Sequence, residues 1–188
     1  MRVGLYGGSF NPAHGGHVHV AQTALVRLAL DRVIWLVSPQ NPLKSKRETA
    51  ALARRIAEAR RLARGPRMVV SDIEARLGAR YTIDTLRRLQ AQFPGVHFVW
   101  IMGADSLAGL HRWKSWAEIL RRVPVAVVDR PGVGLSARLS VAARRFAHAR
   151  RPEREARRLP FLAPPAWMFL TAPHDPRSST ALRRARFP

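Results

Sequence analysis

Short runs of apolar residues alternate along the chain with segments whose apolar residues recur every three or four positions. The runs are rich in β-branched and aromatic residues and are apolar on both faces, which is typical of strands buried inside a parallel sheet. The spaced segments are typical of amphipathic helices. We therefore predict strands at 2–6, 33–37, 68–70, 96–102, 125–128 and 167–170.

Helices are predicted between these strands and are bounded by glycine and proline signals such as Gly65-Pro66 and Pro94-Gly95. Strands that alternate with helices indicate a parallel sheet covered on both sides. We predict an α/β fold, a Rossmann-like doubly wound parallel sheet, with residues 1–188 forming a single domain. The predicted helices cover residues 18–28, 52–63, 83–93, 113–120 and, as a short closing helix, 179–186.

The stretch from Pro131 to Pro165 departs from the alternation because it is rich in arginine and proline. The spacing of Leu139, Ala142 and Phe146 fits one amphipathic helix inside it. We interpret the stretch as a solvated basic excursion between two strands, an interpretation that we favour over a dedicated binding arm.

The charge balance is strongly basic: Lys+Arg is 33 and Asp+Glu is 12, for a formal net charge of +21. Such a field attracts phosphate groups on nucleotides, nucleic acids or membranes. The absence of cysteine excludes disulfides, thiolate nucleophiles and Cys-ligated metals. The sequence shows neither a membrane-spanning apolar run nor a signal peptide, so we expect a cytoplasmic protein.

The first candidate for chemistry is the segment from Gly7 to His17, between the first predicted strand and helix. Its glycines let the backbone turn sharply and approach a ligand. The helix start offers free N–H groups to an anion, and His14 and His17 face the same side of it. A zinc site is the alternative for His-x-x-His, but two histidines supply too few ligands. The segment matches neither the Gly-x-Gly-x-x-Gly fingerprint nor the Walker sequence, so the predicted phosphate site is of another kind.

The second candidate is Ser178-Ser179-Thr180, followed by Arg183. Serine and threonine at a helix start are ordinary N-caps. A guanidinium on the first turn, above those hydroxyls and free N–H groups, favours polyphosphate binding instead.

Together, His14-Gly-Gly-His17 and Ser178-Ser179-Thr180-Ala-Leu-Arg183 resemble the nucleotidylyltransferase superfamily, in which two such motifs clamp a nucleoside triphosphate. The segments Tyr81-Thr-Ile-Asp-Thr85-Leu and Gly103-Ala-Asp105, followed by Trp113, are similar to the bacterial nicotinate-nucleotide adenylyltransferases. The resemblance implies ATP-binding residues at Gly8, Ser9, Phe10, His14, His17, Gly103, Asp105, Ser179, Thr180 and Arg183. It implies that Thr85, Trp113, Lys114 and Arg130 bind nicotinate mononucleotide, and that His14, His17, Lys44 and Arg183 are catalytic.

Two of these residues have structural alternatives in the sequence, and a third does not. Trp113 shares a predicted helical face with Trp116 and Leu120, which is also typical of a core residue. Asp105 is placed to act as a helix N-cap. Thr85 falls off the apolar stripe of its predicted helix, which indicates freedom from packing and favours a ligand role.

The implied reaction transfers AMP from ATP to nicotinate mononucleotide and releases pyrophosphate. We expect Mg²⁺ to be bound through the ATP phosphates and water, without a dedicated protein metal site. The alternatives are phosphopantetheine adenylyltransferase and a basic nucleic-acid-binding module. Because the basic stretch lacks interleaved aromatics, we do not expect nucleic acid as a partner. We expect no membrane partner either; a homo-oligomer is compatible with the sequence.

Two features depart from the family's pattern. The segment Asn41-Pro-Leu-Lys44 lacks the histidine that usually precedes the basic residue, so one phosphate donor is missing. Arg177 stands where the family often has isoleucine.

Overall fold

The computed structural model describes residues 1–39 and 49–171. Within them, seven strands form one parallel sheet in the order β3-β2-β1-β4-β5-β7-β6. This arrangement confirms the predicted Rossmann-like α/β fold. The strands are β1 (Arg2–Gly8), β2 (Arg32–Val37), β3 (Met68–Ser71), β4 (His97–Gly103), β5 (Val125–Val128), β6 (Arg150–Arg151) and β7 (Trp167–Leu170).

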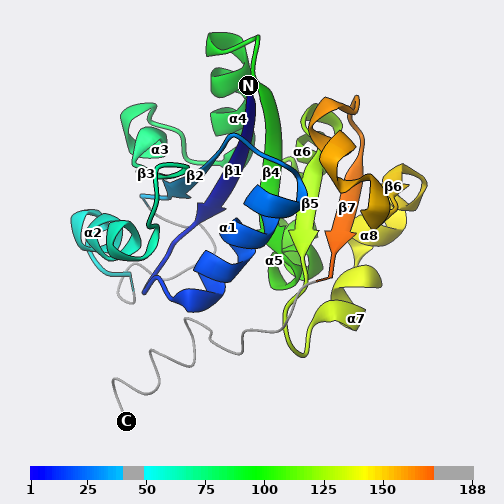
Figure 1. Ribbon diagram of the computed structural model, residues 1–188, viewed down its shortest axis with the longest axis horizontal. Helices are drawn as coiled ribbons and strands as arrows, with labels where there is room; N and C mark the ends of the chain where they lie inside the picture. Colours follow the sequence, from blue (N-terminus) through cyan, green and yellow to red (C-terminus); the bar gives the residue numbers. More distant parts are fainter. Residues whose placement is uncertain (40–48, 172–188) are drawn as a thin grey trace.

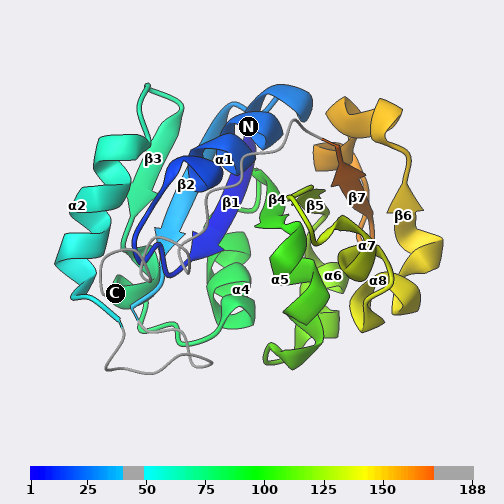
Figure 2. The same cartoon turned by 90° about the horizontal axis from the view of Figure 1, so that it is seen from below.

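Helices cover both faces of the sheet (Figures 1 and 2). The α-helices are α1 (Gly15–Arg27), α2 (Leu52–Leu62), α3 (Ile73–Arg76), α4 (Thr82–Gln92), α5 (Ala104–Gly109), α6 (Trp116–Arg122), α7 (Gly134–Arg138) and α8 (Val141–Arg145). The 3₁₀ helices are η1 (Leu110–Arg112), η2 (Ala147–Ala149) and η3 (Glu153–Phe161). Helices α1, α2 and η3 pack on one face, and α4 to α8 pack on the other. None of the described helices is long and apolar enough to cross a membrane.

The strand order reverses direction between β1 and β4. Strand β1 pairs with β2 on one edge and with β4 on the other. Helix α1 leaves β1 on one face of the sheet, whereas α5 leaves β4 on the opposite face. In parallel sheets of this kind, ligands bind beyond the carboxyl ends of the strands at such a reversal. The ends of β1 and β4, at Gly8 and Gly103, therefore mark the expected binding crevice, on the edge that Figure 2 shows.

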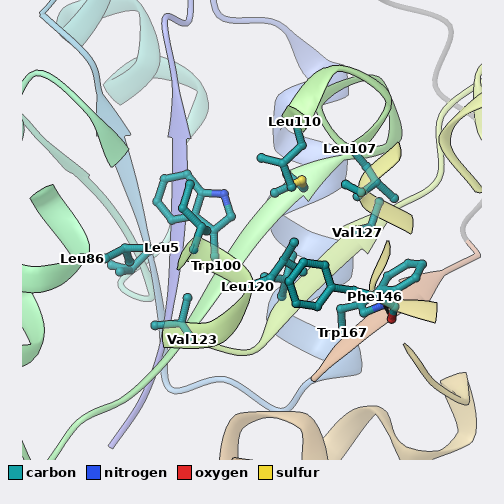
Figure 3. Packing of buried hydrophobic residues seen from close by; sticks show 14 of the residues in the cluster. Leu5, Leu86, Trp100, Leu107, Leu110, Leu120, Val123, Val127, Phe146 and Trp167 are labelled. Carbon is teal, nitrogen blue, oxygen red and sulfur yellow. Dashed lines mark hydrogen bonds between the residues drawn. The ribbon is translucent and has the colours of Figure 1, made fainter. Parts of the chain in front are cut away.

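The apolar strands provide the rigid platform beneath that crevice. All four residues of β5 and of β7 are buried, as are residues 98–103 of β4. On the α4 face, Leu5 and Trp100 pack in one cluster with Leu86 of α4 (Figure 3). Side chains packed this closely leave the strand ends little freedom to move.

Two sequence predictions about helices were wrong. The helix predicted at 113–120 begins only at Trp116, because Trp113 is extended and Ser115 has a left-handed backbone (φ 50°). The single helix predicted from the spacing of Leu139, Ala142 and Phe146 is shorter, because α8 ends at Arg145 and the separate 3₁₀ helix η2 follows it. Ser140 caps the start of α8, where its side chain accepts a hydrogen bond from the Ala143 N–H.

The basic stretch 131–165 packs against the sheet edge, and several of its arginines lie over aromatic rings. The guanidinium carbon of Arg138 is 4.4 Å from the Phe169 ring centroid, and that of Arg150 is 5.6 Å from the Trp167 centroid. Arginine stems cover apolar surface well while their heads stay hydrated. The interpretation as a merely solvated excursion therefore understates the packing of this stretch.

Candidate functional site

The chain turns sharply between β1 and α1. Gly7 lies against the Trp100 indole, where a Cβ would overlap the ring. Phe10 has a left-handed backbone (φ 45°), and its buried ring stacks on Trp35 with the centroids 5.0 Å apart. The ring of Phe10 thus anchors the turn in the core, so that a nucleotide would meet this residue through its backbone.

Gly8 and Ser9 shape the entrance to the same turn. A Cβ on Gly8 would lie 3.2 Å from the Phe10 ring, which is tight. The Ser9 side chain is buried, and its hydroxyl makes no hydrogen bond within residues 1–39 and 49–171. A buried hydroxyl without a partner is costly and is relieved when a ligand or water reaches it.

His14 and His17 form a reciprocal cap at the start of α1. The Nδ1 atom of His14 accepts from the Gly16 N–H at 3.1 Å, and Nδ1 of His17 accepts from the His14 N–H at 3.2 Å. This arrangement is a capping box in which histidines replace the usual hydroxyl and carboxylate. The two ring centroids are only 3.8 Å apart, so the sequence expectation that these rings face the same side is confirmed.

The cap also determines which ring nitrogen carries the proton. An Nδ1 atom that accepts a hydrogen bond has no proton of its own, so each neutral imidazole is protonated at Nε2. Both rings can therefore present an N–H donor at a helix N-terminus while they remain neutral. The helix dipole adds positive potential at the same place, and together these features suit a phosphate oxygen.

Asp105 and Arg130 meet beside the end of β4. Arg130 Nη1 donates to Asp105 Oδ2 across 3.3 Å. A Cβ on Gly103 would lie 2.5 Å from Asp105 Oδ1 and 2.9 Å from Arg130 Cδ, so a larger residue would displace the pair. Gly103 itself is the N-cap of α5, and the alternative role of Asp105 as that N-cap is therefore wrong. Burial, reinforced by the Asp105 charge, raises the pKa of Tyr6 on β1.

Trp113 lies half-buried between η1 and α6, on the α4 face of the sheet. Its ring makes an edge contact with Trp100, with the centroids 6.4 Å apart. The Trp113 N–H donates to the Leu110 carbonyl at 2.9 Å and is thus occupied within the chain. Lys114 is exposed, and its N–H makes no backbone hydrogen bond to a described residue. The resemblance implies that backbone amides around Trp113 and Lys114 bind the pyridine carboxylate, and of these two N–H groups that of Lys114 has no backbone partner among the described residues.

Thr85 is fully buried, so the inference that it is free from packing was wrong. Its hydroxyl donates to Glu74 Oε1 at 3.2 Å and approaches the Tyr81 carbonyl at 3.4 Å. Glu74 is buried as well, and desolvation raises the pKa of its carboxyl to about 7, although the Thr85 hydrogen bond acts in the opposite direction. Both side chains are buried, and the assignment of Thr85 to the acceptor pocket stays a prediction.

The raised pKa of Glu74 predicts a pH-dependent stability difference between the wild type and Glu74→Gln. The unfolded chain releases the Glu74 proton near its ordinary pKa of 4.5, whereas the folded chain retains it up to about 7. Ionisation therefore favours unfolding between these two pH values. The unfolding free energy of Glu74→Gln should rise relative to that of the wild type by up to about 3 kcal/mol between pH 4.5 and pH 8. Urea denaturation at several pH values measures it, and a constant difference would contradict the burial argument.

Four predicted site residues lie outside the described residues: Lys44, Ser179, Thr180 and Arg183. The predicted closing helix at 179–186 and the preceding Ser178 lie outside them as well. The structure places Gly8, Ser9, Phe10, His14 and His17 together from the end of β1 to the start of α1, and Gly103, Asp105 and Arg130 together at the end of β4. Trp113 and Lys114 lie between η1 and α6, and Thr85 is buried on α4.

Sequence reasoning missed two buried charged residues near the site, Arg55 and Glu74. A signal existed for Arg55, because it falls on the apolar stripe of its helix with Leu52 and Ile56 at helical spacing. A charged residue on such a stripe is either solvated at its edge or buried with partners. For Glu74 the sequence offers no comparable periodic signal, since α3 has only four residues.

Comparison with known proteins places this geometry in a family. Residues 5–185 match the family model described as cytidylyltransferase-like. Structural comparison finds the nicotinic acid mononucleotide adenylyltransferase of Plasmodium falciparum complexed with NaAD, with a TM-score of 0.69 at 14% identity. That match covers 97% of this chain and 82% of the other, and it supports the fold.

Much closer relatives appear among curated proteins. One from a Caulobacter species is 66% identical over 183 residues, covering 97% of each chain. One from Methylorubrum extorquens is 57% identical, covering 97% of this chain and 99% of the relative. Both carry the name "Probable nicotinate-nucleotide adenylyltransferase". This chain belongs to the cytidylyltransferase-like family and, within it, to the nicotinate-nucleotide adenylyltransferases.

Proposed function

We propose that the protein transfers AMP from ATP to nicotinate mononucleotide, giving nicotinic acid adenine dinucleotide and pyrophosphate, a step of NAD synthesis. The observation that carries the proposal is the histidine-capped start of α1, placed where the sheet reverses between β1 and β4. The 66% identity to a relative that bears the nicotinate-nucleotide adenylyltransferase name supports the choice of substrates.

The chemistry is a single displacement at phosphorus. A phosphate oxygen of nicotinate mononucleotide forms a bond to the α-phosphorus of ATP, and the bond from that phosphorus to the bridging oxygen breaks. Pyrophosphate leaves with the electron pair. Reactions of this type need positioning and charge stabilisation more than a protein nucleophile. The absence of cysteine is consistent with such a mechanism.

The two histidines would stabilise charge on the transferring phosphate. Each neutral ring has its proton on Nε2, because Nδ1 is held by the cap. A donor that is fixed before the reaction needs no reorganisation when charge develops. Lys44, Arg183 and the helix start at Ser179 and Thr180 would hold the departing pyrophosphate.

The acceptor would lie on the α4 side of the crevice. The half-buried Trp113 indole would offer a ring face to the pyridine, and the Lys114 N–H would bind its carboxylate; the lack of a backbone partner for that N–H among the described residues supports this role. Arg130 lies nearby on the chain segment that follows β5, where its guanidinium already pairs with Asp105. The other oxygen of the Asp105 carboxylate would accept hydrogen bonds from the ribose hydroxyls of the adenosine.

Magnesium would accompany ATP. This cation prefers oxygen ligands and keeps several waters, so the β- and γ-phosphates can supply most of its remaining ligands. No group of three or more His, Asp or Glu side chains within the described ranges is arranged to hold a metal ion. We propose that Mg²⁺ binds through substrate oxygens and water.

The proposal can be tested by pyrophosphate release from ATP and Mg²⁺ with three acceptor conditions. We expect release with nicotinate mononucleotide and background release with phosphopantetheine or without acceptor. Release with phosphopantetheine alone would instead support the related adenylyltransferase. Tight binding to nucleic acid that weakens steeply with salt, without pyrophosphate release, would support the binding module. Cytoplasmic location and homo-oligomer formation stay predictions.

A further inference from the structure

Arg55 is a buried cation whose hydrogen-bond partners among the described residues are backbone carbonyls. It lies on α2 and is 1% exposed. Its Nη1 donates to the carbonyls of Ser9 at 2.8 Å and Ser38 at 2.7 Å, Nη2 donates to Pro39 at 2.8 Å, and Nε donates to Ala50 at 2.8 Å. No carboxylate lies within ion-pair distance of it among the described residues.

These four carbonyls belong to three separate segments of the chain. Ser9 lies in the turn between β1 and α1, Ser38 and Pro39 follow β2, and Ala50 precedes α2. One planar group therefore holds the turn that enters α1 against the end of the neighbouring strand.

Further hydrogen bonds tie the same segments together. The Ser38 N–H and hydroxyl both donate to the Gly8 carbonyl, at 3.0 and 3.2 Å. The Ala50 N–H donates to Asn11 Oδ1 at 3.2 Å. The turn from Gly8 to Asn11 is thus held at both ends, and Arg55 binds its middle.

Burying a guanidinium without a carboxylate is costly, and desolvation lowers the pKa of Arg55. The fork geometry of arginine explains how the site tolerates it, because the N–H groups point in the plane toward four separate acceptors. Lysine has one nitrogen and three donors, so it cannot reach all four carbonyls. If the residue served only to fill this space, an apolar side chain would be less costly. The presence of arginine therefore indicates that its hydrogen bonds, which fix the position of the backbone, are important.

We propose that Arg55 is a positioning residue for the triphosphate site: its guanidinium fixes the Gly8–Asn11 turn and, through it, the place of ATP before the capped start of α1. The inference rests on the proposed function, in that ATP is taken as the ligand of this turn. Trp113 and Lys114 lie on the opposite face of the sheet, so the acceptor pocket has no direct dependence on Arg55.

The experiment compares Arg55→Lys and Arg55→Gln with Arg54→Gln, a matched control on the same helix whose side chain is exposed. Melting temperatures are measured first, and kinetics follow well below the lowest of them. We expect the Arg55 variants to raise the KM for ATP or lower kcat by on the order of tenfold or more, with the acceptor KM nearly unchanged. The Arg54 variant should have the same kcat and KM values as the wild type. A loss of melting temperature alone, or an equal change in both KM values, would overturn the proposal.

A second measurement uses the wild type alone and does not depend on turnover or on the folding of variants. The Nε–H resonance of Arg55 should shift on titration with a non-hydrolysable ATP analogue and stay in place with nicotinate mononucleotide alone. An unchanged resonance at saturating analogue would also overturn the proposal. If analogue binding shifts this resonance although no acceptor yields pyrophosphate, the proposed reaction fails and the positioning role stands.

Discussion

His17→Ala is expected to lower kcat more than tenfold at saturating ATP and acceptor, equivalent to at least about 1.4 kcal/mol of barrier. The substitution removes the Nε2–H donor of a ring whose Nδ1 is held by the cap. Because the interaction strengthens as charge develops on the transferring phosphate, the loss should appear in kcat more than in KM. Steady-state kinetics with both substrates varied measure it. The same logic predicts a loss of this size for Arg183→Ala.

His17→Glu is the matched control for the structural part of that loss. Glutamate at this helix position can accept the hydrogen bond from the His14 N–H, as histidine does here, so the capping box and the melting temperature should be kept. The variant still lacks the donor and adds a negative charge beside the phosphates. We expect it to be at least as inactive as His17→Ala. Wild-type turnover in either variant would show that His17 takes no part in catalysis.

The acceptor preference is the second large expected effect. Nicotinamide mononucleotide replaces a carboxylate with a neutral amide, whose NH₂ opposes an N–H donor in the pocket. Losing a charge-assisted hydrogen bond and leaving one donor poorly paired should cost about 3 kcal/mol, or on the order of a hundredfold in kcat/KM. Kinetics with both acceptors decide this. Equal efficiency would overturn the nicotinate assignment and leave adenylyl transfer intact.

Trp113→Ala tests whether Trp113 binds the acceptor or only packs in the core. Removing the half-buried ring should raise the KM for both acceptors, with little effect on the KM for ATP. Trp113→Phe retains an aromatic face and should recover much of the loss. Trp116→Ala, which removes a ring that packs on Phe146 instead, should lower stability and leave the acceptor preference unchanged. An ATP defect as large as the acceptor defect in Trp113→Ala would mark Trp113 as a core residue.

The strands were predictable because burial on both faces leaves an unbroken apolar run, as at Val125–Val128. Strand β6 was not, since its two residues are exposed arginines with no apolar signal. The late start of α6 depends on the left-handed backbone at Ser115, which periodicity does not reveal. In these cases tertiary packing, and not the local sequence pattern, determines the secondary structure.

The candidate site, like the fold, could be predicted from the sequence only in part. The spacing of His14 and His17 was sufficient to place both rings at one helix start, because helix geometry fixes the relation of residues three apart. Spacing alone does not indicate that each Nδ1 is held by a backbone N–H. Arg55 and Arg54 are neighbours of the same type, yet one is buried on four carbonyls and the other is exposed. Only the packed structure distinguishes them.

In the proposed reaction the adenylyl group moves in one step from ATP to the phosphate of nicotinate mononucleotide. Isotopic labelling of ATP at the α- or the γ-phosphorus tests it directly, with the products separated by chromatography. We expect the α-label to appear in nicotinic acid adenine dinucleotide and the γ-label in pyrophosphate, in equal amounts and only when the acceptor is present. Release of the α-label as free AMP, or its retention on the protein, would contradict direct transfer to the acceptor.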